Sequence, residues 1–80
     1  MTKEQITGEL KSVFEKVFQK KGLTITREMT AKAIEEWDSL RHIQLITDVE
    51  TAFGIKFRLR EVLSMKNVGD LIDLIHTKRA

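Results

Sequence analysis

The chain has 80 residues, with 14 basic and 12 acidic side chains, no cysteine, no proline and four glycines. This length predicts one domain, over residues 1–80, near the lower limit for an independent hydrophobic core. The lack of cysteine excludes disulfides and thiolate metal clusters. The net charge of +2 indicates a mixed, solvated surface rather than the basic footprint of a nucleic-acid-binding protein.

The hydropathy pattern argues against a membrane protein. No apolar run approaches the roughly 20 residues that span a bilayer, and the N-terminal residues lack the hydrophobic stretch of a signal peptide. We therefore expect a cytoplasmic protein without membrane contacts.

The first predicted element is an amphipathic helix over residues 3–21. Thr2 is suited to cap its start, and Gly22 is expected to stop it. Its apolar face follows the 3.6-residue period of a helix. The residues of this face are Ile6, Leu10, Val13, Phe14, Val17 and Phe18.

A long connection follows, over residues 23–38. Leu23 and Ile25 alternate with threonines, which favours an extended loop packed over the core. Thr30 can cap a short turn over residues 31–34. Trp37, the only tryptophan, is expected to act as a hydrophobic staple on the first turns of the next helix.

The second helix is predicted over residues 39–53, with Asp38 as its cap and Gly54 as its end. An apolar stripe along this helix is expected to face the core. The stripe consists of Leu40, Ile43, Ile46, Val49 and Phe53, widened by Leu45 and Ala52.

The C-terminal third of the chain is predicted to hold a linker and two more helices. Ile55, Phe57 and Leu59 alternate with charged residues, but one short strand without a partner is unstable, so we expect an extended linker. A short helix over residues 59–64 and a last helix from Asn67 follow. The last helix should bury Val68, Leu71, Ile72 and Ile75, with His76, Lys78 and Arg79 at its negative end. The predicted fold is an all-α four-helix bundle, with a long loop between helices 1 and 2 and a short helix 3.

Ser39 is the candidate functional residue. At the first position of the second helix its hydroxyl is expected to be exposed, where the helix dipole favours an anion. Asp38, directly before it, is a common N-cap residue, and an Asp-Ser pair alone does not indicate a modification site. Together with its surroundings, however, it resembles the acyl carrier protein family almost end to end. The matching residues are Trp37-Asp38-Ser39-Leu40, Ile43, Ile46, Val49, Glu50, Phe53-Gly54-Ile55 and Asn67-Val68-Gly69-Asp70-Leu71.

The resemblance implies a carrier rather than an enzyme. Ser39 would bear a 4'-phosphopantetheine arm donated by coenzyme A, with Asp38 and Leu40 completing the motif. A separate phosphopantetheinyl transferase would attach the arm with magnesium, and Asp38 would help it organise that metal. The thiol of the arm would hold acyl or aminoacyl groups as thioesters for fatty-acid, polyketide or lipid biosynthesis. Its partners would be acyl-loading and acyl-processing enzymes. The protein itself is expected to be a monomer without a bound metal.

Exposed residues of the second helix and the following linker are expected to form the docking surface. They are Arg41, Gln44, Thr47, Asp48, Glu50, Thr51, Lys56 and Arg58. Glu50 matches an interaction position of the family. Members that serve bulk fatty-acid synthesis are usually strongly acidic, whereas Arg41, Lys56, Arg58 and Arg60 make this surface basic. Because charges at an interface govern partner choice, this favours a specialised pathway over the housekeeping role.

Three other functions compete with this interpretation. A hydrolase could use Ser39 with His42 as its base, but the Gly-x-Ser-x-Gly elbow is absent, and His42 is expected to be a solvated rim residue. A small DNA-binding protein or helical adaptor is a second alternative, although Asp48 and Glu50 would repel phosphates from the second helix. A peptidyl carrier cut from a synthetase is disfavoured, because no linker flanks either end.

Overall fold

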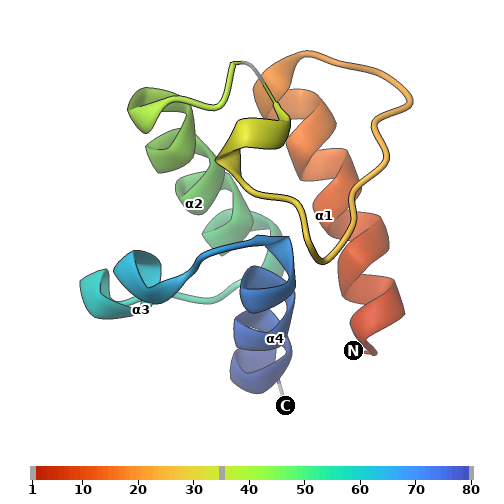
Figure 1. The fold of residues 1–80 in the computed structure, drawn as a ribbon. Coiled ribbons are helices and arrows are strands. Elements are labelled where there is room, and N and C mark those ends of the chain that lie inside the picture. The colour runs from red at the N-terminus through yellow and green to blue at the C-terminus, as the bar shows by residue number, and fades with distance from the viewer. Residues whose placement is uncertain (1, 35, 80) are drawn as a thin grey trace.

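The structure is a computed structural model that describes residues 2–34 and 36–79. These residues form only helices and connections, which confirms the predicted all-α fold with a short third helix. Figure 1 shows α1 and α2 side by side, with α4 beneath them and α3 on the outside. The elements are α1 (Lys3–Phe18), the 3₁₀ helix η1 (Ala31–Ala33), α2 (Ser39–Phe53), α3 (Leu59–Ser64) and α4 (Val68–Arg79).

Helix α1 begins where the sequence predicts and ends earlier. Thr2 and Gln5 form a capping box, in which the Gln5 N–H donates to Thr2 Oγ1 at 3.1 Å. All six predicted core residues are buried. The helix stops at Phe18, because Gln19 adopts a left-handed conformation with φ 53° and its N–H bonds to the Glu15 carbonyl. The prediction that Gly22 ends this helix was therefore wrong.

Helix α2 has the predicted bounds, Ser39–Phe53, and the predicted caps. The Arg41 N–H donates to Asp38 Oδ1 at 2.8 Å, and Gly54 ends the helix with φ 65°.

The buried face of α2 differs from the predicted stripe. Leu45, Val49 and Phe53 are buried, whereas Leu40 is 73% exposed and Ile43 is 64% exposed. Ala52 is also exposed and Ile46 is half-buried. The prediction that Leu40, Ile43 and Ala52 face the core was wrong, because the core lies against the Leu45 side of the helix and leaves the first turns uncovered.

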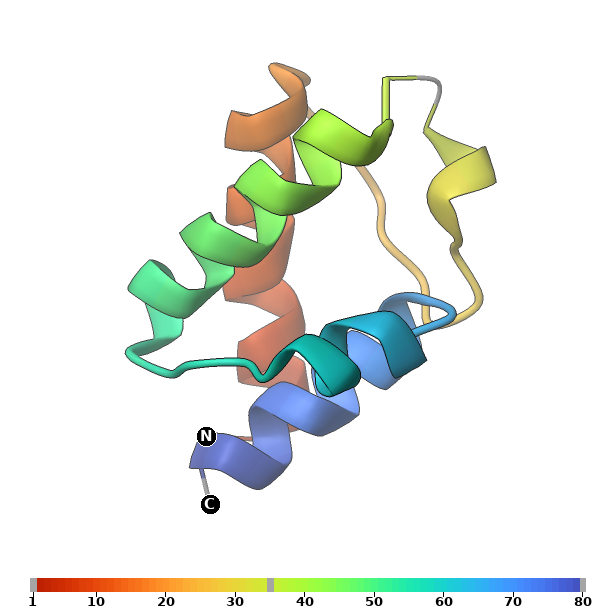
Figure 2. The same cartoon turned by 90° about the vertical axis from the view of Figure 1, so that its left-hand side faces the viewer.

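The long loop between α1 and α2 is tied to the start of α4. The Val68 and Gly69 N–H groups donate to the Met29 and Arg27 carbonyls, each at 2.9 Å. Asn67 Oδ1 accepts from the Asp70 N–H at 2.8 Å, as predicted for a cap. The loop thus satisfies amides of α4 that have no partner within the helix. Figure 2 shows the loop reaching down to the first turn of α4.

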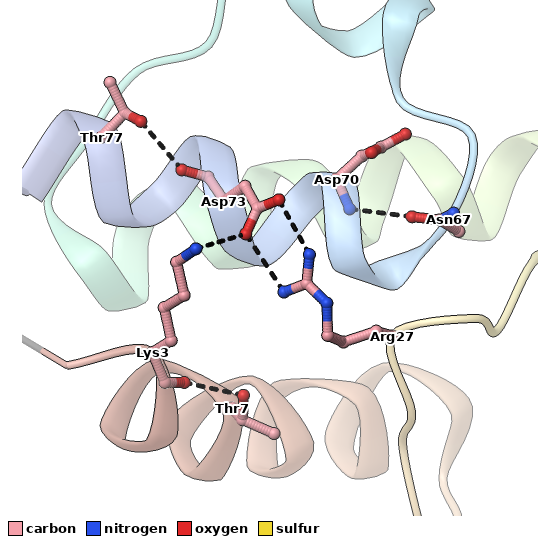
Figure 3. A network of polar contacts seen from close by, with 7 residues as sticks. All are labelled: Lys3, Thr7, Arg27, Asn67, Asp70, Asp73 and Thr77. Carbon is pink, nitrogen blue, oxygen red and sulfur yellow. Dashed lines mark hydrogen bonds and ion pairs between the residues drawn. The ribbon is translucent and has the colours of Figure 1, made fainter.

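A charged network reinforces this junction. Both terminal guanidinium nitrogens of Arg27, Nη1 and Nη2, donate to the Asp73 carboxylate, at 3.1 and 2.9 Å, and Lys3 Nζ lies 3.1 Å from Asp73 Oδ1 (Figure 3). The hydrogen bond from Arg27, and then that from Lys3, lowers the pKa of Asp73 to about 2. Asp73 therefore joins the loop, α1 and α4 at one point.

The linker between α2 and α3 is extended, as predicted. Ile55 is buried and Phe57 is half-buried against the core. Helix α3 has the predicted bounds, and its start is capped by Glu61, whose Oε1 accepts from the Arg58 N–H at 2.7 Å. Glu61 also pairs with Lys78 of α4 at 3.0 Å. The Glu61–Lys78 ion pair thereby joins α3 to α4.

Candidate functional site

Ser39 lies at the first position of α2 and is exposed. Its helix is 15 residues long, so its N-terminus carries a full helix dipole and free amides that favour an anion. Among the described residues, the Ser39 side chain forms no hydrogen bond, while Asp38 is occupied in capping the helix. The hydroxyl is therefore accessible to another protein.

A largely apolar groove opens beside Ser39. It brings together the end of the long loop, the first turns of α2 and the outer face of α3. We call it the outer groove; it is lined by Ala31, Trp37, Asp38, Ser39, His42, Ile43, Leu59, Val62 and Leu63. An exposed hydroxyl at a helix start fits a phosphodiester, and an apolar groove next to it fits an organic arm.

Trp37 and His42 form one wall of this groove. The indole N–H of Trp37 donates to His42 Nδ1 at 3.1 Å, and the two rings lie 6.1 Å apart at an angle of 23°. This contact confirms the predicted staple on the first turns of α2. His42 is half-buried, so the prediction that it is a solvated rim residue was wrong.

The same contact bears on the hydrolase alternative. A nucleophilic serine needs a base oriented toward its hydroxyl. Here the Nδ1 of His42 accepts a hydrogen bond from Trp37, and no bond joins His42 to Ser39 within the described part of the chain. Within the described residues, His42 is therefore not oriented as a base toward Ser39.

Two of the predicted docking residues are used by the fold itself. Arg41 is half-buried, and its Nη1 donates to the Val17 carbonyl at 2.7 Å, which ties the start of α2 to the end of α1. Glu50 Oε2 accepts from the Phe57 N–H at 2.8 Å and holds the linker in place. Neither side chain is free for a partner in this arrangement.

The other predicted docking residues lie where the sequence places them, on α2 and the linker. Thr47 and Thr51 are exposed, and their hydroxyls donate to carbonyls one turn earlier, at 3.0 and 3.1 Å. Asp48 is half-buried. The remaining three, Gln44, Lys56 and Arg58, are exposed.

Sequence reasoning missed the contribution of α3 to the site. Leu59 and Leu63 are 74% and 75% exposed, and with Val62 they line the groove opposite Ile43. Their spacing of three and four residues places them on one helix face. That spacing was visible in the sequence, but apolar residues on one face usually indicate core packing.

Comparison with known proteins finds relatives that match most of the chain. The model of the phosphopantetheine attachment site family matches residues 9–75. An acyl carrier protein from Exiguobacterium sibiricum is 31% identical over 78 residues, which cover 98% of this chain and 99% of that protein. One from another Exiguobacterium strain has the same identity and coverage. The solution structure of holo acyl carrier protein from Geobacter metallireducens has a TM-score of 0.85 and 43% identity, and the match covers 90% of this chain and 83% of that one.

The chain belongs to the acyl carrier protein family. Its match to that family and to a holo acyl carrier protein supports a covalently attached phosphopantetheine as its cofactor. In residues 2–34 and 36–79, no helix is long and apolar enough to cross a membrane. Nor do those residues hold a group of three or more histidine or carboxylate side chains that could bind a metal ion.

Proposed function

We propose that Ser39 is the attachment residue and that the protein delivers acyl or aminoacyl groups to enzymes of a specialised biosynthetic pathway. The observation that carries this proposal is the placement of Ser39. It is an exposed hydroxyl at a helix start, it borders an apolar groove, and it lies within the matched residues 9–75. A transferase can reach such a hydroxyl without unfolding the chain.

In this proposal the chain exposes Ser39 and its arm to other enzymes and does not itself catalyse the reactions of the cargo. Asp38 holds the first turn of α2, and the free amides there favour the phosphodiester electrostatically, by about 0.3–1 kcal/mol when exposed. The arm, when attached, supplies a terminal thiol that holds an acyl group as a thioester. The apolar side chains of the groove shelter that cargo from water.

A surface beside Ser39 provides the contact with partner enzymes. We define the display face as the exposed apolar residues of α2 and α3 with the cations that border them. It consists of Leu40, Ile43, Leu59 and Leu63, with Lys56, Arg58 and Arg60. Among the described residues these three cations form no ion pair. Exposed apolar side chains gathered in one place are typical of interaction sites.

The nearby carboxylates are engaged in hydrogen bonds of the fold and keep their negative charge. Asp38 caps α2, Glu50 holds the Phe57 amide, and Glu61 both caps α3 and pairs with Lys78. Lys56, Arg58 and Arg60 are exposed and, among the described residues, form no ion pair, so the display face carries unpaired cations next to its apolar residues. Because rim charges set partner choice and association rate, it suits enzymes whose docking surfaces carry carboxylates. This complementarity supports the specialised role over the housekeeping one.

The attachment residue is tested by intact mass. Incubation with coenzyme A, magnesium and a broad-specificity transferase should add one phosphopantetheine to the wild type and none to Ser39→Ala. Ser12→Ala, a substitution at an exposed serine of α1, is the matched control and should be modified normally. An unmodified wild type, beside a control carrier that the same transferase modifies, would refute the attachment site.

The specialised role is tested by charge reversal. A malonyl-loading enzyme of bulk fatty-acid synthesis with a cationic docking surface should load the wild type poorly. The triple substitution Lys56→Glu, Arg58→Glu and Arg60→Glu should raise loading, most at low salt, where screening is weakest. Reversing Lys11, Lys16 and Lys21, which are exposed on and after α1, is the matched control. Equal loading of all three proteins across salt would restore the housekeeping role.

A further inference from the structure

Trp37 and His42 meet across the start of α2, next to Ser39. The indole N–H of Trp37 donates to His42 Nδ1 at 3.1 Å. An indole N–H can only donate, so Nδ1 must be without a proton for this bond to form. In a neutral imidazole the proton then resides on the other ring nitrogen, Nε2. The contact therefore fixes the tautomer of His42 and makes Nε2–H a hydrogen-bond donor.

The tryptophan that sets this tautomer is held by the core. Its ring meets Phe14 edge-on, with centroids 5.3 Å apart at 90°, and lies 5.6 Å from the ring of Phe18. Both phenylalanines are buried on α1. Because aromatic rings pack in defined relative orientations, the indole N–H keeps its direction, and His42 is oriented through it.

The Nε2 of His42 has no partner within the described fold. The bond from Trp37 is the one hydrogen bond of the His42 side chain among the described residues. No buried side-chain nitrogen or oxygen of these residues lacks a partner, and His42 is half-buried, so its unpartnered Nε2 lies where solvent reaches it. This oriented N–H at the surface can donate to a ligand.

His42 also lies on the same side of α2 as Ser39. Residues three apart are neighbours on a helix surface, and helical side chains lean over the turn that precedes them. Both residues line the outer groove. Trp37 and His42 are the groove's two side chains with an N–H group, and Trp37 uses its own on His42. Among the described residues, the Nε2–H is therefore the one side-chain N–H of this groove that is not already bonded.

The charged side chains around His42 do not occupy this donor. Asp38 accepts the Arg41 N–H, and Arg41 donates its guanidinium to the Val17 carbonyl. Lys66, which lines a smaller hollow together with His42, is a cation and accepts no hydrogen bond. Helices α3 and α4 bring only uncharged side chains to the two hollows. An anion at Ser39 would thus meet a donor that the fold has left open.

We propose that His42 is a positioning residue for the phosphopantetheine arm, and that its Nε2–H donates to the phosphodiester on Ser39. This inference rests on the proposed function, because it requires the arm to be attached to Ser39. A hydrogen bond to an ionised acceptor is stronger than one between neutral groups, and the amides at the helix start favour the same anion. Trp37 orients the histidine and the histidine holds the phosphodiester, which restricts the directions in which the arm leaves Ser39.

A purely structural staple would behave differently. If the pair only fastened the start of α2, attachment of the arm would leave Nε2 of His42 unaffected. Replacement of His42 would then alter stability without altering the surroundings of the phosphorus. The proposed contact instead predicts that the nitrogen and the phosphorus respond to each other.

The first test uses the unmodified protein and nitrogen NMR, which distinguishes the two nitrogens of an imidazole. At about pH 8, where an unperturbed imidazole is neutral, His42 should carry its proton on Nε2. Trp37→Phe keeps a ring in the core and removes the donor, so it should shift the Nδ1 signal of His42. The signals of His76, which lines neither hollow, should stay in place. A proton on Nδ1 in the wild type would overturn the proposal.

The second test uses the phosphopantetheinylated protein, with intact mass to confirm the arm on Ser39. Attachment should shift the Nε2 signal of His42 and leave Nδ1, which Trp37 still bonds, nearly unchanged. In phosphorus NMR, His42→Phe should change the shift of the phosphodiester because the donor is lost. His42→Gln, which carries an amide N–H at a similar reach, should restore the shift toward the wild-type value. His76→Phe is the matched control, at another half-buried histidine, and should have no effect.

The pH response of the phosphorus separates a contact from a general change of shape. A phosphodiester keeps one negative charge between about pH 5 and 8, the range in which histidine gains a proton. In the wild type and in His76→Phe, the phosphorus shift should therefore follow the protonation of His42, and in His42→Gln it should be constant. If the arm is on Ser39 and either the Nε2 signal or the phosphorus shift fails to respond, the positioning role is wrong and the carrier function stands. If mass shows no arm on Ser39, beside a control carrier that the same transferase modifies, the attachment site and this inference fall together.

Discussion

The two halves of α2 differ in what they contact. The C-terminal half buries Leu45, Val49 and Phe53, and Gly54 closes it. The N-terminal half carries Ser39 and leaves Leu40 and Ile43 mostly exposed. One continuous helix thus packs into the core at one end and displays apolar residues to solvent at the other.

This difference shows how a small carrier can present a site rigidly without enclosing it. The packed half fixes the direction of the helix, and Arg41 bonds the first turn to the end of α1 through the Val17 carbonyl. The displayed half can then leave its apolar residues exposed, as the proposed contact with cargo and partners requires. Helix α3 resembles the N-terminal half of α2 in this respect. Its Leu59 and Leu63 are exposed, while Glu61 forms an ion pair with Lys78 of α4.

The largest predicted effect contrasts the two halves directly. Phe53→Ala removes a ring that is 3% exposed and should lower the free energy of unfolding by about 3–5 kcal/mol. Against a total of about 5 kcal/mol for so small a domain, much of the protein would be unfolded. Ile43→Ala, the control in the displayed half, should change it by less than about 0.5 kcal/mol. Urea denaturation measures both, and similar values for the two variants would contradict the contrast.

A second prediction concerns the junction of the loop with α4, which supports the packed half. A Cβ at Gly69 would lie 3.0 Å from the Arg27 carbonyl oxygen, the same oxygen that accepts the Gly69 N–H. Gly69→Ala should therefore lower stability by about 1–2 kcal/mol, as overpacking does. Gly8 of α1 has open space around it, so Gly8→Ala should raise stability by about 0.5–1 kcal/mol. Opposite signs in thermal melts would support the close approach, whereas a gain in both would refute it.

The smallest predicted effect is the pH dependence of the Asp73 network. The folded pKa of Asp73 is lowered from 3.8 to about 2, so its stabilisation is present above about pH 4 and is lost as the pH falls toward 2. These side chains are about half exposed and solvent screens them, so Asp73→Asn should lower Tm at pH 7 by less than about 5 °C. The difference between variant and wild type should shrink below pH 4. A constant difference from pH 7 to pH 3 would show that the charge is not responsible.

Local patterns in the sequence were sufficient for most of the helices. The caps Thr2, Asp38 and Gly54 act within a few residues, and they set the start of α1 and both ends of α2 as predicted. The end of α1 was missed, because Gln19 takes a left-handed conformation that local rules assign to glycine. It is held there by Glu15, whose carbonyl accepts the Gln19 N–H and whose carboxylate accepts the Leu23 N–H at 3.1 Å.

The candidate site was only partly readable in the sequence. Its centre, Asp38-Ser39-Leu40, is a contiguous motif, so its position at a helix start followed from capping alone. The structural roles of Arg41 and Glu50 could not be predicted from the sequence. Arg41 bonds to the carbonyl of Val17, which is far away in the sequence, and Glu50 bonds to the backbone N–H of Phe57, and no sequence motif indicates either contact. The Trp37–His42 contact spans five residues across a helix start, and its chemistry depends on the rotamers that packing selects.

The sequence by itself determined the helical class, the helix order and the placement of Ser39 at the start of α2. These depend on hydrophobic period and capping, which act over one or two turns. Only the tertiary structure decided which side of α2 is buried. A stripe of seven apolar residues fits more than one rotation of the helix, and the choice was made by contact with the core. That choice left Leu40 and Ile43 exposed, and Ile43 lines the groove together with the apolar face of α3.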